Sequence, residues 1–390
     1  MSAALNVFAC RTVKRFGICG EKRWIVEFFF VLPIIPRVID TEEKLQALLP
    51  PLRATPWMAL DTEADSLHAY PEKLCLLQIS SEGVEALVDP LANVDLKPLL
   101  EIFHDHQLIM HGADYDLRLL RKTFDFRPTS IFDTMLAARL IGAREFGLGN
   151  LVAKYLGVKL EKGPQKADWA RRPLTPRMEE YARNDTRFLK PLADLLREEL
   201  KAKGRLSWHE ESCALLIEEC AIVKTPDPDA VWRVKGSFHL GPHSLAVLRD
   251  IWHWREKEAV AANKPPYFIL QPEQMIGLSI AAVELRALEP LLPKRFSPRR
   301  HAGLMKAINR GLHEPDRPQP VRAVHYRQSA DEKRRYHELE KRRNKRATEL
   351  GIDATIIASR SMLVQLARKD AEPDESGLMS WQRELLKPTS

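Results

Sequence analysis

The chain has 390 residues, of which 45% are hydrophobic, and a formal net charge of +7 at pH 7. A chain of this length and apolar content can bury more than one core, so we predict two or three domains. Its five cysteines have no paired spacing and no Cys-x-x-Cys motif, which argues against a disulfide framework and against structural zinc. We therefore expect a reducing compartment and a cytoplasmic location.

The first 37 residues are the hardest to interpret. Residues 1–24 are basic and nearly free of acid, which is superficially similar to an organelle-targeting segment. Residues 25–35 are apolar, but Glu27 and Pro33 interrupt them and they fall short of the ~18 residues that span a bilayer. Because the recognisable pattern begins only near Val38, we favour an overlong gene start over targeting for residues 1–37.

Strands and helices then alternate. Residues 41–52 predict a helix with Thr41 as its N-cap. Short apolar runs at 57–60, 75–79, 86–88 and 108–110 predict strands. This order predicts an α/β sheet domain whose first three strands form an antiparallel meander.

Two carboxylates end the first predicted strand. Asp61 and Glu63 are two residues apart, so both side chains point to the same face of a strand. Their like charges repel, and the pair is tolerated most easily when a divalent cation or an opposite charge lies between them. The alternative is a pair of solvated carboxylates on an edge strand.

Further acidic residues follow at positions that favour convergence. Asp116 lies near the start of a predicted helix just past a strand, where open α/β sheets place their sites. Tyr181 and Asp185 are four residues apart in a helical stretch, so they share one face. Asp133 is explained most simply as a helix N-cap, and we leave it out of the site.

These motifs resemble ribonuclease D and the wider group of 3′–5′ exonucleases called DEDDy, which have four metal-binding acidic residues and a tyrosine. The motifs are Asp61-Thr-Glu63, Asp116 and Tyr181-x-x-x-Asp185, and the resemblance covers roughly residues 38 to 200. It implies a ribonuclease H-like exonuclease domain at 38–204.

The resemblance also implies a role for each motif residue. Two Mg²⁺ or Mn²⁺ ions, bound by oxygen ligands, would stabilise the attacking and leaving oxygens during phosphodiester hydrolysis. Asp61 would bridge both ions, Glu63 and Asp185 would complete the site on the nucleophile side, and Asp116 would hold the second ion through water. Tyr181 would orient the attacking water, because a phenol with a pKa near 10 is mostly protonated at pH 7.

Five other residues are candidate substrate contacts. Gln78 either satisfies a polar position in the sheet or contacts a terminal nucleotide, and His111 has a structural alternative at a strand end. Lys166, Trp169 and Arg172 belong to a loop, residues 159–172, that interleaves cations with an aromatic. This composition suits a clamp on a phosphate backbone and a stacked base, although a solvated surface loop is the alternative.

The remainder of the chain predicts helices. We expect a connecting helix and linker at 205–240, and residues 241–313 resemble an HRDC domain through the segment Pro-Pro-Tyr-Phe-Ile-Leu at 265–270. In that segment Tyr267 and Phe268 are expected in the core. A proline-rich linker at 314–329 precedes a second, more divergent HRDC-like unit at 330–390.

Positive charge is concentrated in this helical part. Residues 294–346 contain 17 basic and 6 acidic residues. Such a segment suits a salt-dependent tether for nucleic acid. The alternative is a charged helix whose cations pair with nearby glutamates, Glu332, Glu338 and Glu340.

We predict a metal-dependent 3′–5′ exoribonuclease that releases nucleoside 5′-monophosphates and trims transfer RNA precursors, a substrate implied by the resemblance alone. RNA is the expected partner, with no membrane and no obligate protein partner. The alternatives are a DNA exonuclease with the same site and a catalytically weak RNA-binding scaffold. A scaffold has no reason to keep all five motif residues.

Overall fold

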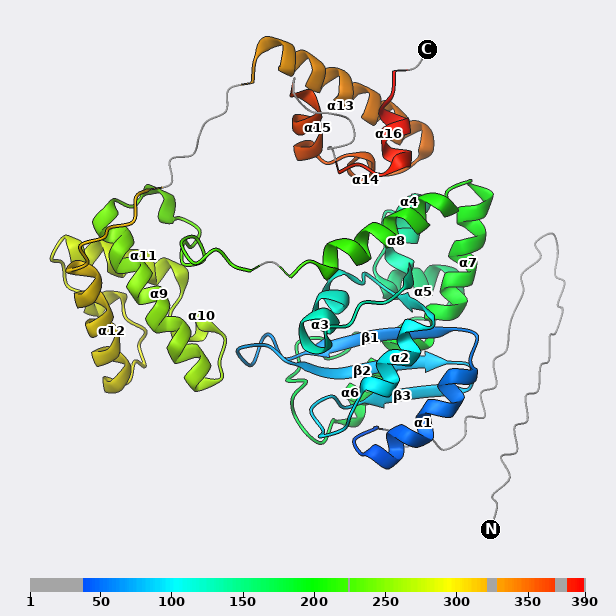
Figure 1. The fold of residues 1–390 in the computed structure, drawn as a ribbon, viewed down its shortest axis with the longest axis horizontal. Coiled ribbons are helices and arrows are strands. Elements are labelled where there is room, and N and C mark those ends of the chain that lie inside the picture. Colours follow the sequence, from blue (N-terminus) through cyan, green and yellow to red (C-terminus); the bar gives the residue numbers. More distant parts are fainter. Residues whose placement is uncertain (1–37, 224, 321–327, 369–376, 389–390) are drawn as a thin grey trace.

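The computed structural model describes residues 38–223, 225–320, 328–368 and 377–388. They form an α/β unit followed by two helical units (Figure 1). The predicted extension at 1–37 lies outside the described residues, as does 321–327 of the predicted proline-rich linker. No helix in the described ranges is long and apolar enough to cross a membrane.

One five-stranded sheet, in the order β3-β2-β1-β4-β5, is the centre of the α/β unit. β1, β2 and β3 pair in antiparallel fashion, as predicted, while β4 and β5 extend the sheet in parallel from β1. The strands are β1 (Met58–Ala64), β2 (Leu74–Ser81), β3 (Val84–Val88), β4 (Gln107–Met110) and β5 (Ser130–Asp133). β5 was not predicted, because its two apolar residues, Ile131 and Phe132, make too short a run to indicate a strand.

Helices cover both faces of this sheet, because alternate side chains of a strand point in opposite directions. On β1, Met58 and Leu60 join the core formed with α1, α2, α3 and α8, while Ala59 joins the core formed with α4, α5 and α7. Thr41 caps α1 as predicted. The helices are α1 (Glu42–Ala54), α2 (Lys97–His104), α3 (Asp114–Phe124), α4 (Thr134–Ile141), α5 (Leu148–Leu156), α6 (Pro176–Arg187), α7 (Leu189–Ala202) and α8 (Leu206–Ala221).

Helix α8 belongs to the α/β unit and is more than a connection. Its residues Cys213, Ile217 and Cys220 are buried in the same core as β1 and β2. The α/β unit therefore continues past the predicted boundary at residue 204, because the apolar stripe of α8 covers one face of the sheet.

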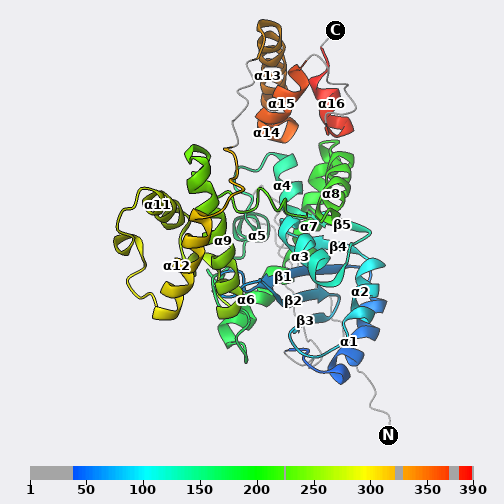
Figure 2. The same ribbon diagram turned by 60° about the vertical axis from the view of Figure 1, so that its left-hand side comes forward.

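Both later units are helical, as predicted, and their resemblance to HRDC domains stays a prediction. The first helical unit contains η1 (Ser237–His239), α9 (Pro242–Ala262), α10 (Pro266–Ile269), α11 (Pro272–Val283), η2 (Glu289–Leu291) and α12 (Pro298–Leu312). The second contains α13 (Ala330–Leu350), α14 (Ala354–Ile357), α15 (Arg360–Ala367) and α16 (Ser380–Leu386). In Figure 2 the first lies beside the sheet and the second beyond α4 and α8.

The second helical unit shares a hydrophobic core with the α/β unit. Ile357, Leu363 and Trp381 join the cluster that contains the buried residues of α4 and α7. The ring of Trp381 stacks on Trp208 with centroids 4.8 Å apart. Arg205 donates to the carbonyl oxygens at both Leu140 and Leu350, at 2.6 and 2.7 Å. This unit is therefore docked on α4, α7 and α8.

Candidate metal centre

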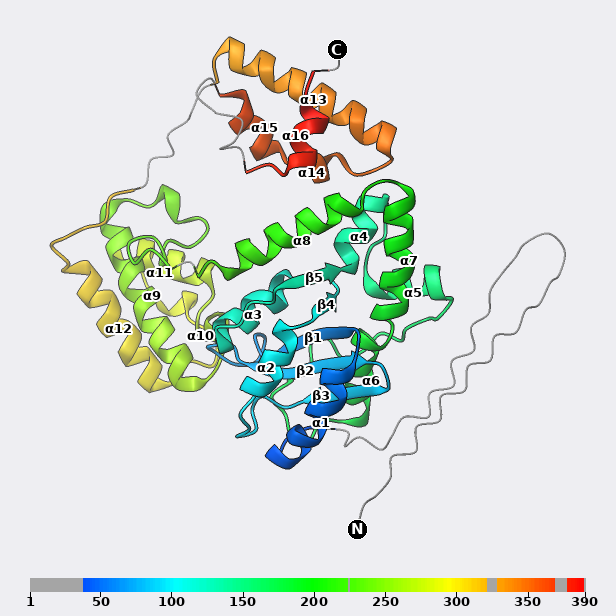
Figure 3. The ribbon, with the colours of Figure 1, turned by 45° about the vertical axis from the view of Figure 1, so that its right-hand side comes forward.

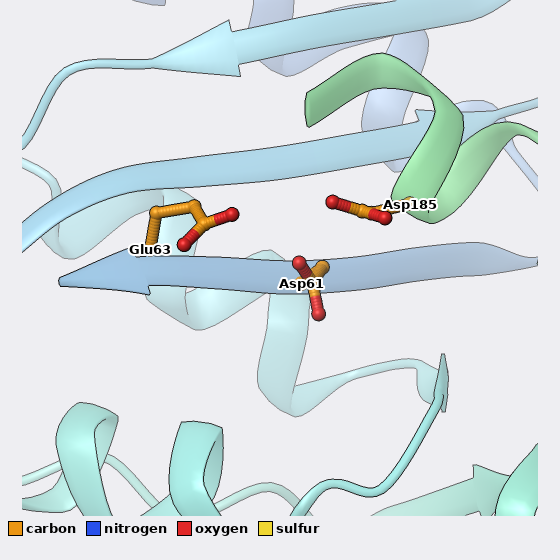
Figure 4. A group of neighbouring side chains, drawn as sticks. All are labelled: Asp61, Glu63 and Asp185. Atoms are coloured by element: carbon orange, nitrogen blue, oxygen red, sulfur yellow. The ribbon is translucent and has the colours of Figure 1, made fainter. Parts of the chain in front are cut away.

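Asp61, Glu63 and Asp185 come together along the second half of β1. One carboxylate oxygen from each lies within 4.8 Å of the others (Figure 4). The first two project from the same face of the strand, as its period of two predicts. Asp185 reaches them from α6, which crosses that face.

The position of Asp185 is set by contacts that fix α6 to the sheet. Thr175 caps the helix by accepting from the backbone N–H of Met178. The Arg187 guanidinium donates to both carboxylate oxygens of Glu85 on β3, at 2.8 and 2.9 Å. Next to Asp185, the Thr186 hydroxyl lies 2.8 Å from that of Ser80 on β2. These contacts leave Asp185 facing β1.

Asp116 approaches from the start of α3 and lies outside the group of three. It is buried, and one of its carboxylate oxygens accepts a hydrogen bond from the Thr62 hydroxyl. Thr62 lies between Asp61 and Glu63 and points the other way, so the same strand helps to position Asp116 as well. No role was predicted for Thr62, although the alternation of side chains along β1 places it on the face opposite Asp61 and Glu63.

Burial and like charge oppose ionisation of these carboxylates. Burial, followed by the charges of Asp116, Asp185 and Glu63, raises the pKa of Asp61 well above its ordinary value. Burial raises the pKa of Glu63 to about 9, and those of Asp116 and Asp185 to about 7. Hard oxygen ligands crowded in this way fit divalent cations such as Mg²⁺ or Mn²⁺, whose charge would favour the ionised forms.

Tyr181 lies one helical turn before Asp185, and its hydroxyl acts to lower the pKa of Asp185 against the larger effect of burial. Burial and the neighbouring Asp185 charge raise the pKa of the Tyr181 phenol, so the hydroxyl is protonated near neutral pH. Its ring packs 6.1 Å from that of Trp169. Gly163 lies against the same ring, and a Cβ at this position would clash with it. These contacts make Tyr181 a fixed hydrogen-bond donor beside the carboxylates.

Residues 36–201 match the family model described as "3'-5' exonuclease". A ribonuclease D from Granulibacter bethesdensis is 30% identical over 374 residues, which are 90% of this chain and 90% of that protein. The chain belongs to the ribonuclease D family.

Two further comparisons agree with that assignment. Ribonuclease D from Gluconacetobacter diazotrophicus is 33% identical over 251 residues, covering 63% of this chain and 63% of that relative, which is less than two thirds of its length. The solved structure of Escherichia coli RNase D, described as "an exoribonuclease involved in structured RNA processing", is 25% identical, with a TM-score of 0.68 over 90% of this chain and 97% of that one. The α/β unit therefore has the ribonuclease H-like exonuclease fold that the family resemblance implied.

Two substrate contacts suggested by the loop composition are corrected by the structure. Trp169 is only 1% exposed and packs in a core with Leu174 and Met178, so its ring is not an open surface for a base. Arg172 donates to both oxygens of Asp89, at 2.5 and 2.6 Å, and to the Cys75 carbonyl oxygen at 2.7 Å. Its guanidinium is thus engaged in holding the loop to the sheet.

The other three predicted substrate contacts have different surroundings. Gln78 is fully buried and its amide donates to Asp61 at 3.3 Å, so it orients a carboxylate. His111 lies 2.9 Å from the Thr134 hydroxyl, and burial lowers its pKa. Lys166 is exposed, and its role in binding a phosphate stays a prediction.

Proposed function

We propose that this chain is a metal-dependent 3′–5′ exoribonuclease that hydrolyses RNA from its 3′ end and releases nucleoside 5′-monophosphates. The observation that carries the proposal is the convergence of three carboxylate oxygens within 4.8 Å, two from β1 and one from α6. Membership of the ribonuclease D family supports RNA as the substrate.

Four carboxylates would hold the divalent ions. Asp61, Glu63 and Asp185 would bind one ion, and Asp61 and Asp116 would bind the second, with oxygen ligands throughout. Bound Mg²⁺ or Mn²⁺ supplies a hydroxide near neutral pH and stabilises charge on the phosphate oxygens. Gln78 orients Asp61 and Thr62 orients Asp116. The protonated Tyr181 hydroxyl positions the attacking water by donating to it or by fixing Asp185.

Structured RNA, such as transfer RNA precursors, is the substrate class that we propose. It is supported by the similarity to Escherichia coli RNase D, which is described as acting in structured RNA processing. Free thiols at Cys75, Cys213 and Cys220 are in keeping with the reducing, cytoplasmic environment that we propose from the cysteine pattern.

The test is a time course on matched 5′-labelled single-stranded RNA and DNA with Mg²⁺, Mn²⁺ or EDTA. The wild-type chain should give a ladder that shortens from the 3′ end of RNA with either metal and no ladder in EDTA. Asp61→Asn should lack this activity, whereas Glu82→Gln, an exposed carboxylate in the β2–β3 turn, should retain it.

Each of three results would contradict the proposal. Faster cleavage of DNA than RNA would indicate a DNA exonuclease. RNA binding without cleavage of either strand would indicate a scaffold. Full activity of Asp61→Asn would contradict the proposed metal ligands.

A further inference from the structure

The first helical unit holds the loop that leaves the metal centre. This loop, residues 65–73, follows the end of β1 and projects toward α10 (Figures 1 and 3). The Tyr70 hydroxyl donates to Glu256 on α9 at 2.5 Å. A second contact comes from α10, where the Tyr267 hydroxyl donates to the Leu67 carbonyl oxygen at 3.4 Å. The loop therefore connects β1, which carries Asp61 and Glu63, directly to α9 and α10.

This contact leaves two aromatic side chains of α10 open to solvent. Tyr267 is 40% exposed and Phe268 is 60% exposed, with ring centroids 4.7 Å apart, although the sequence analysis expected both in the core. Leu67 of the loop, beside Tyr267, is 44% exposed. We call Leu67, Tyr267 and Phe268 the aromatic ledge. The following residue, Ile269, fills the core in their place, so the ledge is not needed to bury α10.

The ledge is close to the metal centre. Leu67 is four residues after Glu63, and an extended chain spans at most about 3.5 Å per residue, so their Cα atoms are within about 14 Å of each other. An RNA strand whose 3′ nucleotide lies at the carboxylates would therefore have its upstream nucleotides within reach of Leu67, which contacts Tyr267 of the ledge.

Cations for a phosphate backbone flank the same loop. The Lys264 ammonium donates to the His68 carbonyl oxygen at 3.3 Å, and the His68 ring lies 2.9 Å from the Lys166 carbonyl oxygen. Both lysines are exposed. Exposed aromatic faces interleaved with lysines are the combination that binds single-stranded nucleic acid without sequence preference.

We propose that the aromatic ledge stacks unpaired bases of the RNA strand upstream of the 3′ nucleotide held at the metal centre. The proposal rests on the proposed function for the identity of the strand. It gives the first helical unit a direct part in substrate binding, since two of the three ledge residues belong to α10. The alternative is that a protein partner binds the same surface, which would not require an aromatic ring at position 268.

The test uses the full chain in EDTA, so that binding is measured without hydrolysis. The probe is an RNA of about 12 nucleotides that carries 2-aminopurine at successive positions from its 3′ end, because stacking on an aromatic ring quenches this base. We expect quenching at one or two adjacent internal positions. Phe268→Leu, which keeps an apolar side chain but no ring, should remove it, and Phe268→Trp should restore it.

A control and a kinetic measurement complete the test. Phe238→Leu removes another aromatic of the same unit, 76% exposed in η1, and should leave the quenching unchanged. With Mg²⁺, Phe268→Leu should raise KM for the same RNA about 5- to 160-fold, the range expected when one base no longer stacks, with kcat unchanged. Its activity on a dinucleotide, which lacks the upstream bases that the ledge is proposed to stack, should equal that of the wild type.

Quenching that survives in Phe268→Leu, or that disappears equally in Phe238→Leu, would overturn the inference. So would an equal loss of activity on the dinucleotide and the longer RNA. Because the fluorescence is read in EDTA, a wild-type chain that binds and quenches RNA but never cleaves it would contradict the proposed function and leave the ledge supported.

Discussion

The carboxylates of the metal centre lie close together although each is negative when ionised. In the protein without metal, burial and mutual repulsion raise the pKa of Glu63 to about 9, and burial raises that of Asp185 to about 7. An unfolded carboxyl titrates near pH 4. Between about pH 4 and pH 9 the native state therefore binds more protons than the unfolded chain, so its free energy of unfolding falls as pH rises.

The fall in the free energy of unfolding with rising pH can be measured as a melting temperature. The melting temperature of the EDTA-treated protein should fall from about pH 5 to pH 9, and it should fall less steeply in Glu63→Gln, whose side chain cannot ionise. Differential scanning calorimetry measures both, with Glu82→Gln as the control. Mn²⁺ should raise the melting temperature of the wild type most at the alkaline end. An identical slope in Glu63→Gln and wild type would show that Glu63 does not titrate as described.

Tyr181 is predicted to act as a donor rather than a base. Tyr181→Phe keeps the ring against Trp169 and removes only the hydroxyl, so kcat for RNA should fall by about 10²-fold, as for other positioned donors. KM and the melting temperature should change little. The pH profile of the residual activity should keep its shape, since the raised pKa of the phenol places its ionisation above the working range. If the wild-type rate rises with pH and Tyr181→Phe loses that rise, Tyr181 would instead be a catalytic base, which has to be deprotonated to act.

Residue patterns predicted much of the candidate site because the motifs are local. Alternation on a strand placed Asp61 and Glu63 on one face, and helical spacing placed Tyr181 with Asp185. Arg172 could not be interpreted in the same way. It pairs with Asp89, a residue 83 positions away, and no local pattern reports such a partner.

At the scale of elements, the loop before α6 supports Tyr181 through a glycine. Gly163 lies so close to the Tyr181 ring that a Cβ at position 163 would displace it. We expect Gly163→Ala to lower kcat about as much as Tyr181→Phe, by roughly 10²-fold, with little change in melting temperature. Gly149→Ala, where a Cβ meets open space, is the matched control. Wild-type kcat in Gly163→Ala would show that the loop does not hold the ring.

Elements with a clear local signal were predicted more reliably than those without one. Thr41 marks the start of α1 and the apolar run 108–110 indicated β4, whereas β5 has two apolar residues and no visible period. The role of α8 was also underestimated. Its buried Cys213 and Ile217 are typical of any amphipathic helix, and only the fold reveals that they cover the sheet.

At the scale of the whole molecule, the basic segment 294–346 is partly paired within the protein. Arg299 and Arg300 contact Glu258, Arg310 contacts Asp250, and Arg343 is buried. Other cations are exposed and have no side-chain partner among the described residues: Lys294, Arg295, Lys306, Lys333 and Lys341. Fewer cations of this segment are therefore available to bind nucleic acid than the count of charges in the sequence suggested.

These exposed cations predict that the affinity for RNA depends on salt concentration. Replacing Lys294 and Lys306 together with alanine should reduce the slope of log K against log salt for single-stranded RNA by about 0.7 for each phosphate that is no longer neutralised. Fluorescence anisotropy at several salt concentrations measures the slope. Lys201→Ala, whose lysine pairs with Glu198 on α7, should leave it unchanged. Equal slopes in the double variant and the wild type would exclude these two residues from the tether.

We propose that Asp61 and Glu63 of β1, together with Asp116 and Asp185, hold the ions that cleave RNA. The most direct measurement is an anomalous difference map from crystals soaked in Mn²⁺ at a concentration that supports activity. We predict two peaks that share Asp61, one also bound by Glu63 and Asp185 and the other beside Asp116. Strong peaks elsewhere, with none in contact with Asp61, would contradict the account.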